Sequence, residues 1–587
     1  MNSKITKKDF LIIMVMTILY LAMALINLGD NKAPQTGWVS GGINREFSID
    51  FGEKKQLDKI TYYCGLGKDW YSVAALDVYY LNDKEKYIKC GRIEKVSSDM
   101  FKWKEMSLDV NTSSLKFISD YYVSEDKSIN GIRGEFKEIE VYESGATIPI
   151  KIVEIKELNK KTIDTNKLFD EQDIVVYKST FMNTTYFDEV YFPRTAYEYI
   201  NGIYPYENTH PPLGKLIIMW AIKLFGFTPF GWRIFGTISG ALMIPLMYVF
   251  GKKVFKTTFL AFVSAFLMMF DFMHFTQTRI GTVDGYLTFF IILMFYYMNK
   301  YFMQKSYEIK YRVNIYPLIM SGIFFGLAAS VKWIGLYAGA GIALLYFLKQ
   351  FIEIRNHKKG IIGKEKFIKK IILPTMLLCV LFFIIIPLGI YYLTYIPVFK
   401  AVGSEHHISA FINMQKSMYA YHSGVTSTHP YASPWWQWPG DIRPVYFYQL
   451  KNPPEGMWGA IASFGNPLIW WVGFGSLFSS AIIAWKKKDK RVIFIFVAYL
   501  SLLLPWAIAP RKVTFLYHYF SCVPFIIFAI VYNIEYILEK YRKSKKIIIL
   551  YLILVALLFA VFYPVLSGSV VPLKYIESLR WLPSWYF

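Results

Sequence analysis

Two adjacent carboxylates, Asp188 and Glu189, are the first residues of this chain that suggest chemistry. They stand in an aromatic stretch, Thr185-Tyr-Phe-Asp-Glu-Val-Tyr-Phe-Pro-Arg194. Burial against aromatic rings and a like charge next door both raise a carboxyl pKa, which suits a general acid or base. Neighbouring side chains on a regular element point in different directions. One carboxylate would therefore face the reacting atoms while the other orients it or holds substrate. A solvated surface pair is the alternative.

A second group of candidates could bind an anion. The cations stand in the stretch His-Pro-Pro-Leu-Gly-Lys215 and beside long apolar runs: His210, Lys215, Arg233, Arg279, Lys332 and Arg511. Asp284 follows Arg279 closely and is a further candidate for holding the same ligand. Fixed cations at the ends of membrane spans are unusual unless they have a partner. The alternatives are headgroup contacts, a turn role for His210 and an ion pair between Arg279 and Asp284.

Aromatic residues form the third candidate group. The stretch Ser433-Pro-Trp-Trp-Gln-Trp-Pro439 contains Trp435, Trp436 and Trp438, and Arg443 follows it. Clustered tryptophans can pack against sugar rings, a polyprenyl chain or an acceptor, because their ring faces are apolar and their edges polar. An interfacial aromatic belt is the alternative.

The elements that must position these residues are membrane spans. The 587 residues are 54% hydrophobic and only 18% charged, which excludes an ordinary cytosolic enzyme and a disordered chain. The four cysteines exclude a disulfide-built scaffold, and their spacing to histidine suggests no metal site. Apolar runs predict about eleven transmembrane helices, at 10–29, 232–251, 257–274, 283–299, 314–331, 333–349, 371–396, 461–485, 492–509, 514–534 and 547–566.

The charge distribution gives the expected orientation. The net charge is +22, and basic residues greatly outnumber acidic ones in 1–9, 251–256, 300–312, 349–370, 486–491 and 535–546. Cytoplasmic loops collect Lys and Arg, so these pieces and the N-terminus are expected in the cytoplasm, and nucleic acid is not needed to explain the charge. A twelve-span alternative adds 213–227, which we instead interpret as an interfacial helix whose Lys215 and Lys223 snorkel to the headgroups.

An all-β insertion is expected at 36–150, where short alternating stretches are separated by turn residues. Phe47-Ser-Ile-Asp-Phe-Gly52 and Phe136-Lys-Glu-Ile-Glu-Val-Tyr142 resemble a discoidin-type, galactose-binding-like jelly roll. The function of such a domain would be carbohydrate binding, or else packing and partner docking. Cys64 and Cys90 could form a disulfide or be simply buried. The expected divisions are an N-terminal anchor at 1–35, the β-sandwich at 36–150 and an external catalytic loop at 151–230. A transmembrane core at 231–396, an external aromatic loop at 397–460, and C-terminal helices with an external tail at 461–587 follow.

Taken together, these motifs resemble the protein O-mannosyltransferase family. The matching pieces occur in family order: Phe187-Asp-Glu189, His210-Pro-Pro-Leu-Gly-Lys215, Trp232-Arg-Ile-Phe-Gly236, Arg279-Ile-Gly-Thr-Val-Asp284, Lys332-Trp-Ile-Gly-Leu-Tyr337, Ser433 to Pro439, and Arg511 to Tyr519. The resemblance covers residues 1–35 and 180–587. It implies a polytopic α-helical membrane protein with the C-type glycosyltransferase fold and an active site on the outer face.

The resemblance also implies the chemistry. The donor would be polyprenyl-phosphate mannose, the acceptor a Ser or Thr hydroxyl of an exported protein, and the transfer inverting. Asp188 would be the general base, with Glu189 beside it. The donor phosphate or sugar would be held by His210, Lys215, Arg233, Arg279, Asp284 and Arg511. Trp435, Trp436, Trp438 and Arg443 would contact acceptor or lipid. No cofactor is expected, a divalent metal dependence stays open, and an oligomer is compatible with the pattern.

The chain departs from the eukaryotic members of that family. Its large insertion lies between the first span and the Asp-Glu motif, and no long insertion stands in the later external loop. With the Lys- and Ile-rich composition, this indicates a bacterial plasma membrane. Two other functions stay open: a lipid-phosphate-dependent transferase of another sugar, similar to the lipid A aminoarabinose transferases, and a transporter or carbohydrate sensor. The gathering of ionisable residues at one face, without internal repeats, disfavours a transporter.

Overall fold

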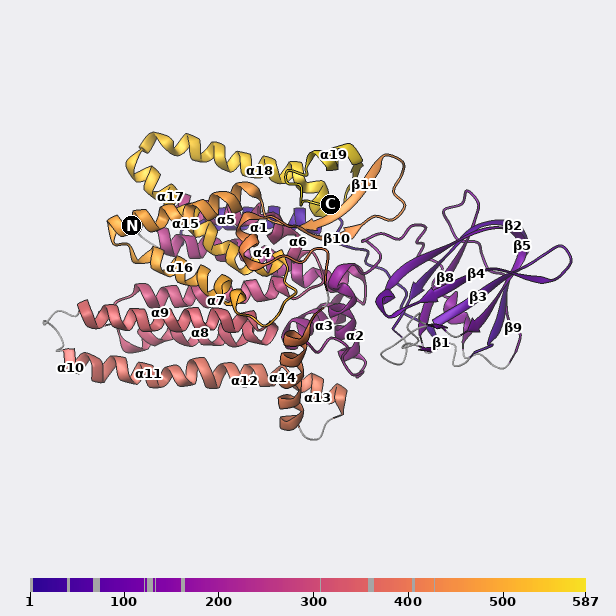
Figure 1. Cartoon of the computed structure of the whole chain (residues 1–587), viewed down its shortest axis with the longest axis horizontal. Helices are drawn as coiled ribbons and strands as arrows, with labels where there is room; N and C mark the ends of the chain where they lie inside the picture. Colours follow the sequence, from indigo (N-terminus) through magenta and orange to yellow (C-terminus); the bar gives the residue numbers. More distant parts are fainter. Residues whose placement is uncertain are drawn as a thin grey trace. The chain divides into compact units, whose positions relative to one another are not determined.

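The computed structural model describes residues 4–39, 43–66, 74–120, 122–123, 130–131, 134–159, 164–306, 308–356, 364–403, 407–426 and 428–587. The chain forms two compact units (Figure 1). The helical unit comprises Met1–Ile26, Glu198–Trp220 and Arg233–Phe587, and the sheet unit comprises Asn27–Tyr197 and Ala221–Trp232.

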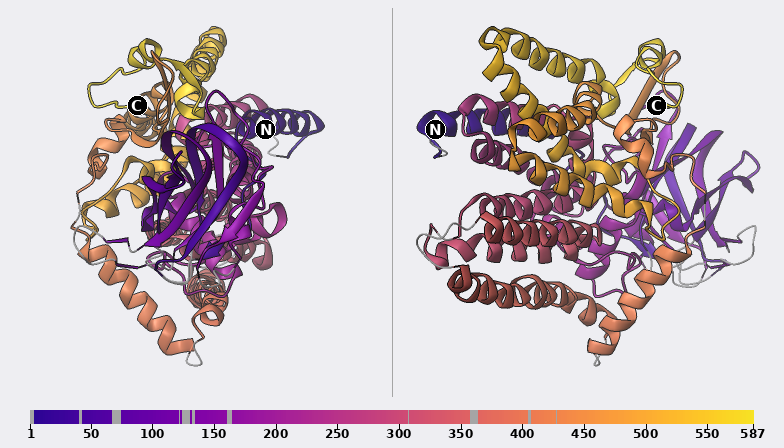
Figure 2. Two further views of the ribbon diagram at one scale, coloured as in Figure 1. Left: turned by 90° about the vertical axis from the view of Figure 1, so that its right-hand side faces the viewer. Right: turned by 60° about the vertical axis from the view of Figure 1, so that its left-hand side comes forward.

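The helical unit is a bundle of long apolar helices that run side by side (Figures 1 and 2). Its main helices are α1 (Lys7–Leu25), α4 (Pro229–Phe255), α5 (Thr258–Met269), α6 (Phe272–Thr278), α7 (Asp284–Met303), α8 (Tyr311–Val331), α9 (Ile334–Asn356), α15 (Pro467–Lys487), α16 (Lys490–Leu503), α17 (Val523–Lys540) and α18 (Lys545–Ser567). A further continuous rod is built from α10 (Lys364–Phe367), α11 (Leu373–Val380) and α12 (Ile386–Leu393), joined by π-helical turns at Ile368–Ile372 and Leu381–Ile385.

Shorter elements stand between the spans. They are α2 (Phe192–Ile200) and α3 (Leu213–Phe225), which cross the division between the units, and α13 (Ile396–Val402), α14 (His407–Gly424), α19 (Leu573–Ser578) and the antiparallel strands β10 (Val445–Gln449), β11 (Met457–Ser463) and β12 (Val570–Pro572). The segment expected as an aromatic loop, 397–460, therefore contains helices and a hairpin strand in its described part.

The chain is a multi-pass membrane protein. Among the described residues, nine helices are long and apolar enough to cross a membrane, or ten if α5 and α6, bent by 58°, count as one span. These ten coincide with ten of the eleven predicted spans. The eleventh prediction, 283–299, corresponds to α7, which is 20 residues long but is not one of the apolar candidates. Segment 213–227 is also outside that set, in line with its interpretation as something other than a span.

A buried carboxylate anchors the first span. The Asp9 side chain is fully buried, accepts hydrogen bonds from Tyr248 and Thr258, and pairs with Lys252 at 3.0 Å. Asp9 also accepts a 2.9 Å hydrogen bond from the Thr6 backbone N–H, which caps the start of α1. Because both charges are paired and hydrogen-bonded, the burial of this pair is tolerated.

The sheet unit is built on one antiparallel sheet. Its strands are β1 (Trp38–Val39), β2 (Glu46–Cys64), β3 (Ala74–Leu81), β4 (Tyr87–Lys95), β5 (Lys102–Asp120), β8 (Glu135–Glu143) and β9 (Glu154–Glu157), in the order β1-β8-β2-β5-β3-β4 with β9 beside β2; β6 (Tyr122–Val123) and β7 (Asn130–Gly131) form a separate pair. The first part of β2 pairs with β9 and the second part with β8, with register shifts between them. The sheet therefore bends around an apolar core that includes Phe47, Ile60 and Phe117.

The predicted all-β region is thus present, but its seven main strands belong to one bent sheet rather than to two facing sheets. The likeness to a discoidin-type jelly roll stays a prediction. Cys64 and Cys90 are both free thiols, so the disulfide that the sequence left open is not formed.

Candidate active site

A cavity of about 200 Å³ opens at one end of the helical bundle. It lies where α8 ends and α9 begins. Three further segments close around it: the end of α14, the segment that follows α16, and the segment that precedes α17. Its walls combine cations, histidines and aromatic rings: His210, Pro211, Lys332, Trp333, Ile334, Tyr337, Tyr419, His422, Trp506, Ala509, Pro510, Arg511 and His518. The described wall contains no carboxylate, so the cavity is suited to an anion.

Lys332 is held at the break between two helices. Its backbone is extended, with φ −158° and ψ 145°, and ends α8. The Lys332 Nζ donates to Asp284 Oδ1 at 2.9 Å, and both residues are buried. Asp284 begins α7, so three helix ends meet at this ion pair. The alternative of an ion pair between Arg279 and Asp284 is therefore wrong. The Arg279 guanidinium instead donates to the Ala24 and Ile26 carbonyls at the end of α1.

Glu207 organises the loop before α3. Its carboxylate contacts His210 Nδ1 at 2.8 Å and accepts from Lys215 Nζ at 2.5 Å. The Lys215 ammonium also donates to the Glu207 and His210 carbonyls at 2.7 Å. Lys215 is only 1% exposed, so the prediction that it snorkels to the headgroups is wrong. The Glu207 carboxylate holds the Lys215 ammonium inside the protein, and the same carboxylate holds the His210 ring at the cavity wall.

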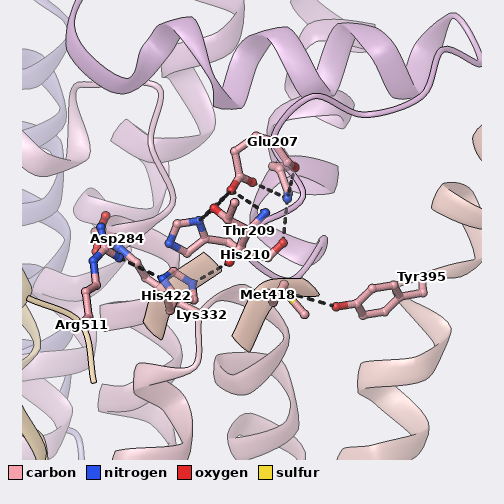
Figure 3. A network of polar contacts seen from close by, with 10 residues as sticks. Glu207, Thr209, His210, Asp284, Lys332, Tyr395, Met418, His422 and Arg511 are labelled. Carbon is pink, nitrogen blue, oxygen red and sulfur yellow. Dashed lines mark hydrogen bonds and ion pairs between the residues drawn. The ribbon is translucent and has the colours of Figure 1, made fainter. Parts of the chain in front are cut away.

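His422 connects this loop to Arg511 (Figure 3). Its Nε2 lies 2.7 Å from the Thr209 carbonyl, and its Nδ1 lies 3.5 Å from Arg511 Nη1. Arg511 Nε donates to the Val513 carbonyl at 2.9 Å, which fixes the guanidinium at the cavity. The His210 and His422 rings meet edge to face, with centroids 5.2 Å apart. Residues from distant parts of the chain thus form one polar network beside the cavity.

The protonation states of this network follow from its contacts. Burial, with repulsion from His210 and Arg511, lowers the pKa of His422 to about 4. Burial also lowers the pKa of His210, despite the opposing charge of Glu207. For Glu207, burial alone would raise the pKa, but Lys215 and His210 outweigh it and the pKa is lowered. At neutral pH the histidines are therefore uncharged, and Lys332 and Arg511 are the fixed cations of the wall.

Replacing Glu207 by Gln should destabilise the protein by about 3–5 kcal/mol, because it leaves the buried Lys215 ammonium without its counter-charge. Since the folded-state pKa of Glu207 is lowered, its stabilisation is present above the ordinary value of 4.5 and is lost as the pH falls below it. The unfolding temperature should therefore fall more steeply between pH 7 and pH 3 in the wild type than in Glu207→Gln. Glu455→Gln, at an exposed carboxylate, is the control. Equal slopes for all three proteins would contradict this role.

His518 lines the cavity and is supported from behind by tryptophan. Trp438 is fully buried and stacks on His518 with centroids 5.8 Å apart, while its Nε1 donates to Ser433. Trp506 also packs on His518, with ring centroids 4.5 Å apart. In the described part of the chain, His518 Nε2 has no hydrogen-bond partner, although it is buried. Trp438 therefore contacts His518 and does not line the cavity; its direct contact with acceptor or lipid stays a prediction.

The tryptophans of the aromatic stretch differ sharply in exposure, which gives a matched pair of variants. Trp438→Ala should cost about 3–5 kcal/mol of stability, since it empties a packed site. Trp436 is 63% exposed, so Trp436→Ala should change stability by less than about 0.5 kcal/mol. Unfolding temperatures of the two variants check this. A loss of transfer in Trp436→Ala without a loss of stability would support its predicted substrate contact.

Asp188 and Glu189 belong to the sheet unit. They lie in a 3₁₀ turn, Phe187–Val190, in which the Tyr186 N–H donates to the buried Glu189 carboxylate at 3.3 Å, and Asp188 is half-buried. The preceding Phe187 has a φ of 48°, which is strained for an aromatic residue and is often found at functional turns. Thr185 fixes the turn to the sheet unit, because its Oγ1 donates to the Met100 carbonyl at 2.7 Å.

The structure thus brings together His210, Lys332 and Arg511 in one wall, with Lys215 and Asp284 as their buried supports. Arg233, Arg279, Trp435 and Arg443 do not line this cavity; Arg233 is fully buried on α4 and Arg443 donates to the Ala432 carbonyl. The sequence analysis missed Glu207, His422 and His518 as site residues. One signal could have found two of them: histidine occurs only eight times in the chain, and three of these line the cavity.

The fold is that of the C-type membrane glycosyltransferases. The Saccharomyces cerevisiae protein O-mannosyltransferase Pmt1-Pmt2 complex, bound to the sugar donor, matches with a TM-score of 0.59 and 16% identity, over 69% of this chain and 89% of that chain. Two family models match the sequence: dolichyl-phosphate-mannose-protein mannosyltransferase over residues 173–402, and the C-terminal four-helix membrane region of protein O-mannosyltransferase over residues 407–585. Together they span more than half of the chain, which belongs to the protein O-mannosyltransferase family.

Bacterial relatives show the same similarity. The polyprenol-phosphate-mannose–protein mannosyltransferase of Mycobacterium tuberculosis is 24% identical over 468 residues, which cover 68% of this chain and 87% of that protein. The Corynebacterium glutamicum enzyme of the same name is 23% identical over 430 residues, covering 64% and 81%. The family resemblance predicted from the motifs is therefore confirmed.

Proposed function

We propose that this protein transfers mannose from polyprenyl-phosphate mannose to Ser or Thr hydroxyl groups of exported proteins, with inversion at the anomeric carbon. The observation that carries the proposal is the cavity in which Lys332 and Arg511 face three histidines and aromatic rings, in a chain of this family. A lipid phosphate fits such a wall, because two fixed cations can pair with its oxygens while ring faces contact sugar or prenyl groups.

In the proposed step, Asp188 accepts the proton of the acceptor hydroxyl as the hydroxyl oxygen bonds to the anomeric carbon. The bond between that carbon and the phosphate oxygen breaks, and polyprenyl phosphate leaves with its electron pair. Negative charge on the phosphate grows during this step. Lys332 and Arg511 would therefore stabilise the transition state more than the bound donor. Glu189 would hold the loop, since its carboxylate accepts the Tyr186 N–H.

We place the enzyme in a bacterial plasma membrane, with the N-terminus in the cytoplasm and the active site outside. The charge distribution supports this orientation. The cavity lies at the start of α9, whereas the other end of α9 carries Arg355 and precedes the basic 357–370 stretch. Basic ends of spans face the cytoplasm.

The decisive experiment measures transfer of radiolabelled mannose to a Ser/Thr-rich peptide by purified protein in lipid vesicles. We expect transfer from polyprenyl-phosphate mannose, none from GDP-mannose, and inhibition by free polyprenyl phosphate; the same assay with EDTA measures any dependence on a divalent metal. An α-anomeric donor giving a β-anomeric product, or the reverse, would support inversion. Lack of transfer by well-folded protein from polyprenyl-phosphate mannose would overturn the donor assignment.

A further inference from the structure

A second cavity lies at the end of the bundle away from the active-site cavity. It is an open groove of about 820 Å³ between the last turns of α9 and α15 and the first turns of α16. α9 spans 23 residues, about 34 Å, and the active-site cavity includes its first turn while the groove includes its last turns. The two cavities are therefore separate sites.

The floor of the groove is apolar. Phe351 and Ile352 from α9 face Ile493, Phe496 and Val497 from α16 across it. Phe351 is 62% exposed and Ile493 is 41% exposed, so the chain itself leaves this floor partly uncovered. The volume is in the range of about 300–1,000 Å³ that binding sites for small molecules occupy. An acyl chain is an occupant of suitable chemistry.

The mouth of the groove is cationic. Arg355, Lys488 and Lys490 line it, and no ion pair joins any of the three to an acidic residue in the described part of the chain. The one carboxylate of the lining, Asp489, is already paired with the Arg491 guanidinium at 2.6 Å. Three cations without an acidic partner in the described part of the chain therefore line one mouth, where an anionic group could contact them.

The acidic residues near the mouth form ion pairs with other cations. Glu535 pairs with Arg491 at 2.7 Å, and Glu539 pairs with Lys487 at 2.6 Å. Trp485 is 88% exposed on the last turn of α15 and belongs to the groove lining. Tryptophan at this position of a span is typical of the depth of lipid headgroups. A more polar cavity of about 260 Å³, whose lining includes the ion pair between Lys349 and Glu353, shares Ile352 and Lys490 with the groove and gives a headgroup room.

We propose that this groove binds an anionic phospholipid of the adjacent leaflet. One acyl chain would lie on the floor between α9 and α16, and the phosphate would contact Arg355, Lys488 and Lys490. Basic pockets between spans on the cytoplasmic side are suited to anionic headgroups. A second copy of this chain fits less well, because an identical cationic mouth would face its own charge in a two-fold contact. The proposal does not depend on the sugar transferred.

The test uses the full-length protein, stripped of lipid in detergent and given vesicle lipids. Native mass spectrometry counts bound lipid, and thermal unfolding measures the stabilisation. Phosphatidylglycerol should bind and raise the unfolding temperature, whereas phosphatidylcholine should not. Combining Arg355→Gln, Lys488→Gln and Lys490→Gln should weaken phosphatidylglycerol binding by at least about tenfold.

Two matched variants separate a built site from general charge. Lys366→Gln, Lys543→Gln and Lys546→Gln together remove the same charge at exposed positions outside the groove and should keep full binding. Ala481→Phe fills the groove without changing charge and should weaken binding, since Ala481 is an exposed wall residue. Equal losses in the two charge variants, or full binding in Ala481→Phe, would overturn the proposal. So would equal binding of both lipids, or self-association that displaces lipid.

Discussion

Asp188→Asn should lower mannosyl transfer by about 10²–10⁴-fold while leaving the protein folded. An asparagine has nearly the shape of aspartate but cannot accept the proton of the acceptor hydroxyl. The 3₁₀ turn that carries Asp188 is held by the Glu189 carboxylate and by Thr185, neither of which the substitution changes. Donor binding, measured by protection against thermal unfolding, should therefore be retained, and the loss should appear in kcat.

The control for this prediction is Asp83→Asn, at an exposed carboxylate of the same unit. It should keep wild-type transfer and stability. Asp188→Asn with wild-type kcat would exclude this residue as the general base. A variant that unfolds at a lower temperature and loses donor binding would instead assign Asp188 a structural role.

The second large effect concerns the ion pair between Lys332 and Asp284. Lys332→Met alone should destabilise the protein by about 3–5 kcal/mol, because a buried carboxylate is left without its partner. Combining it with Asp284→Asn removes both charges and should recover most of that stability, since the remaining amide is neutral. Unfolding temperatures of the single and double variants measure the difference.

Transfer activity separates the two roles of Lys332. If its ammonium stabilises the leaving phosphate, the double variant should be stable and still deficient in transfer. A stable double variant with full activity would show that the pair only holds the ends of α7, α8 and α9 together. Asp284→Asn alone is a useful third measurement, because it keeps the cation and removes its counter-charge.

The sequence predicted the spans well because a membrane imposes a local signal, a long run without charge. The motif resemblance also pointed to His210 and Arg511 as donor-binding residues; both line the cavity, and their role stays a prediction. Prediction from the sequence failed where the partner of a side chain lies outside the helix that carries the side chain. Lys215 was expected to reach the headgroups, yet Glu207 eight residues earlier holds it inside.

Other differences have the same origin. A tryptophan in Ser433 to Pro439 can face ligand or interior, and no local pattern separates the exposed Trp436 from the buried Trp438. Arg279 and Asp284 are neighbours in sequence, but the helix start at Asp284 directs its carboxylate to Lys332.

The sheet was expected as an insertion beside the catalytic loop. The contact from Thr185 to Met100 shows that the Asp-Glu turn is fastened to it, so removing 36–150 would also remove part of the support of that turn.

The anchor of the first span has a consequence for biogenesis. Asp9 is made near the beginning of synthesis, but its partners Tyr248 and Lys252 follow 239 and 243 residues later. Until the ribosome has delivered α4, the carboxylate lacks its folded-state partner Lys252, and burying it would be costly. We therefore expect the first helix to complete its packing only when α4 and α5 are present. Insertion and assembly are thus successive events for this helix, and a nascent chain that ends before α4 should leave Asp9 open to water-soluble reagents.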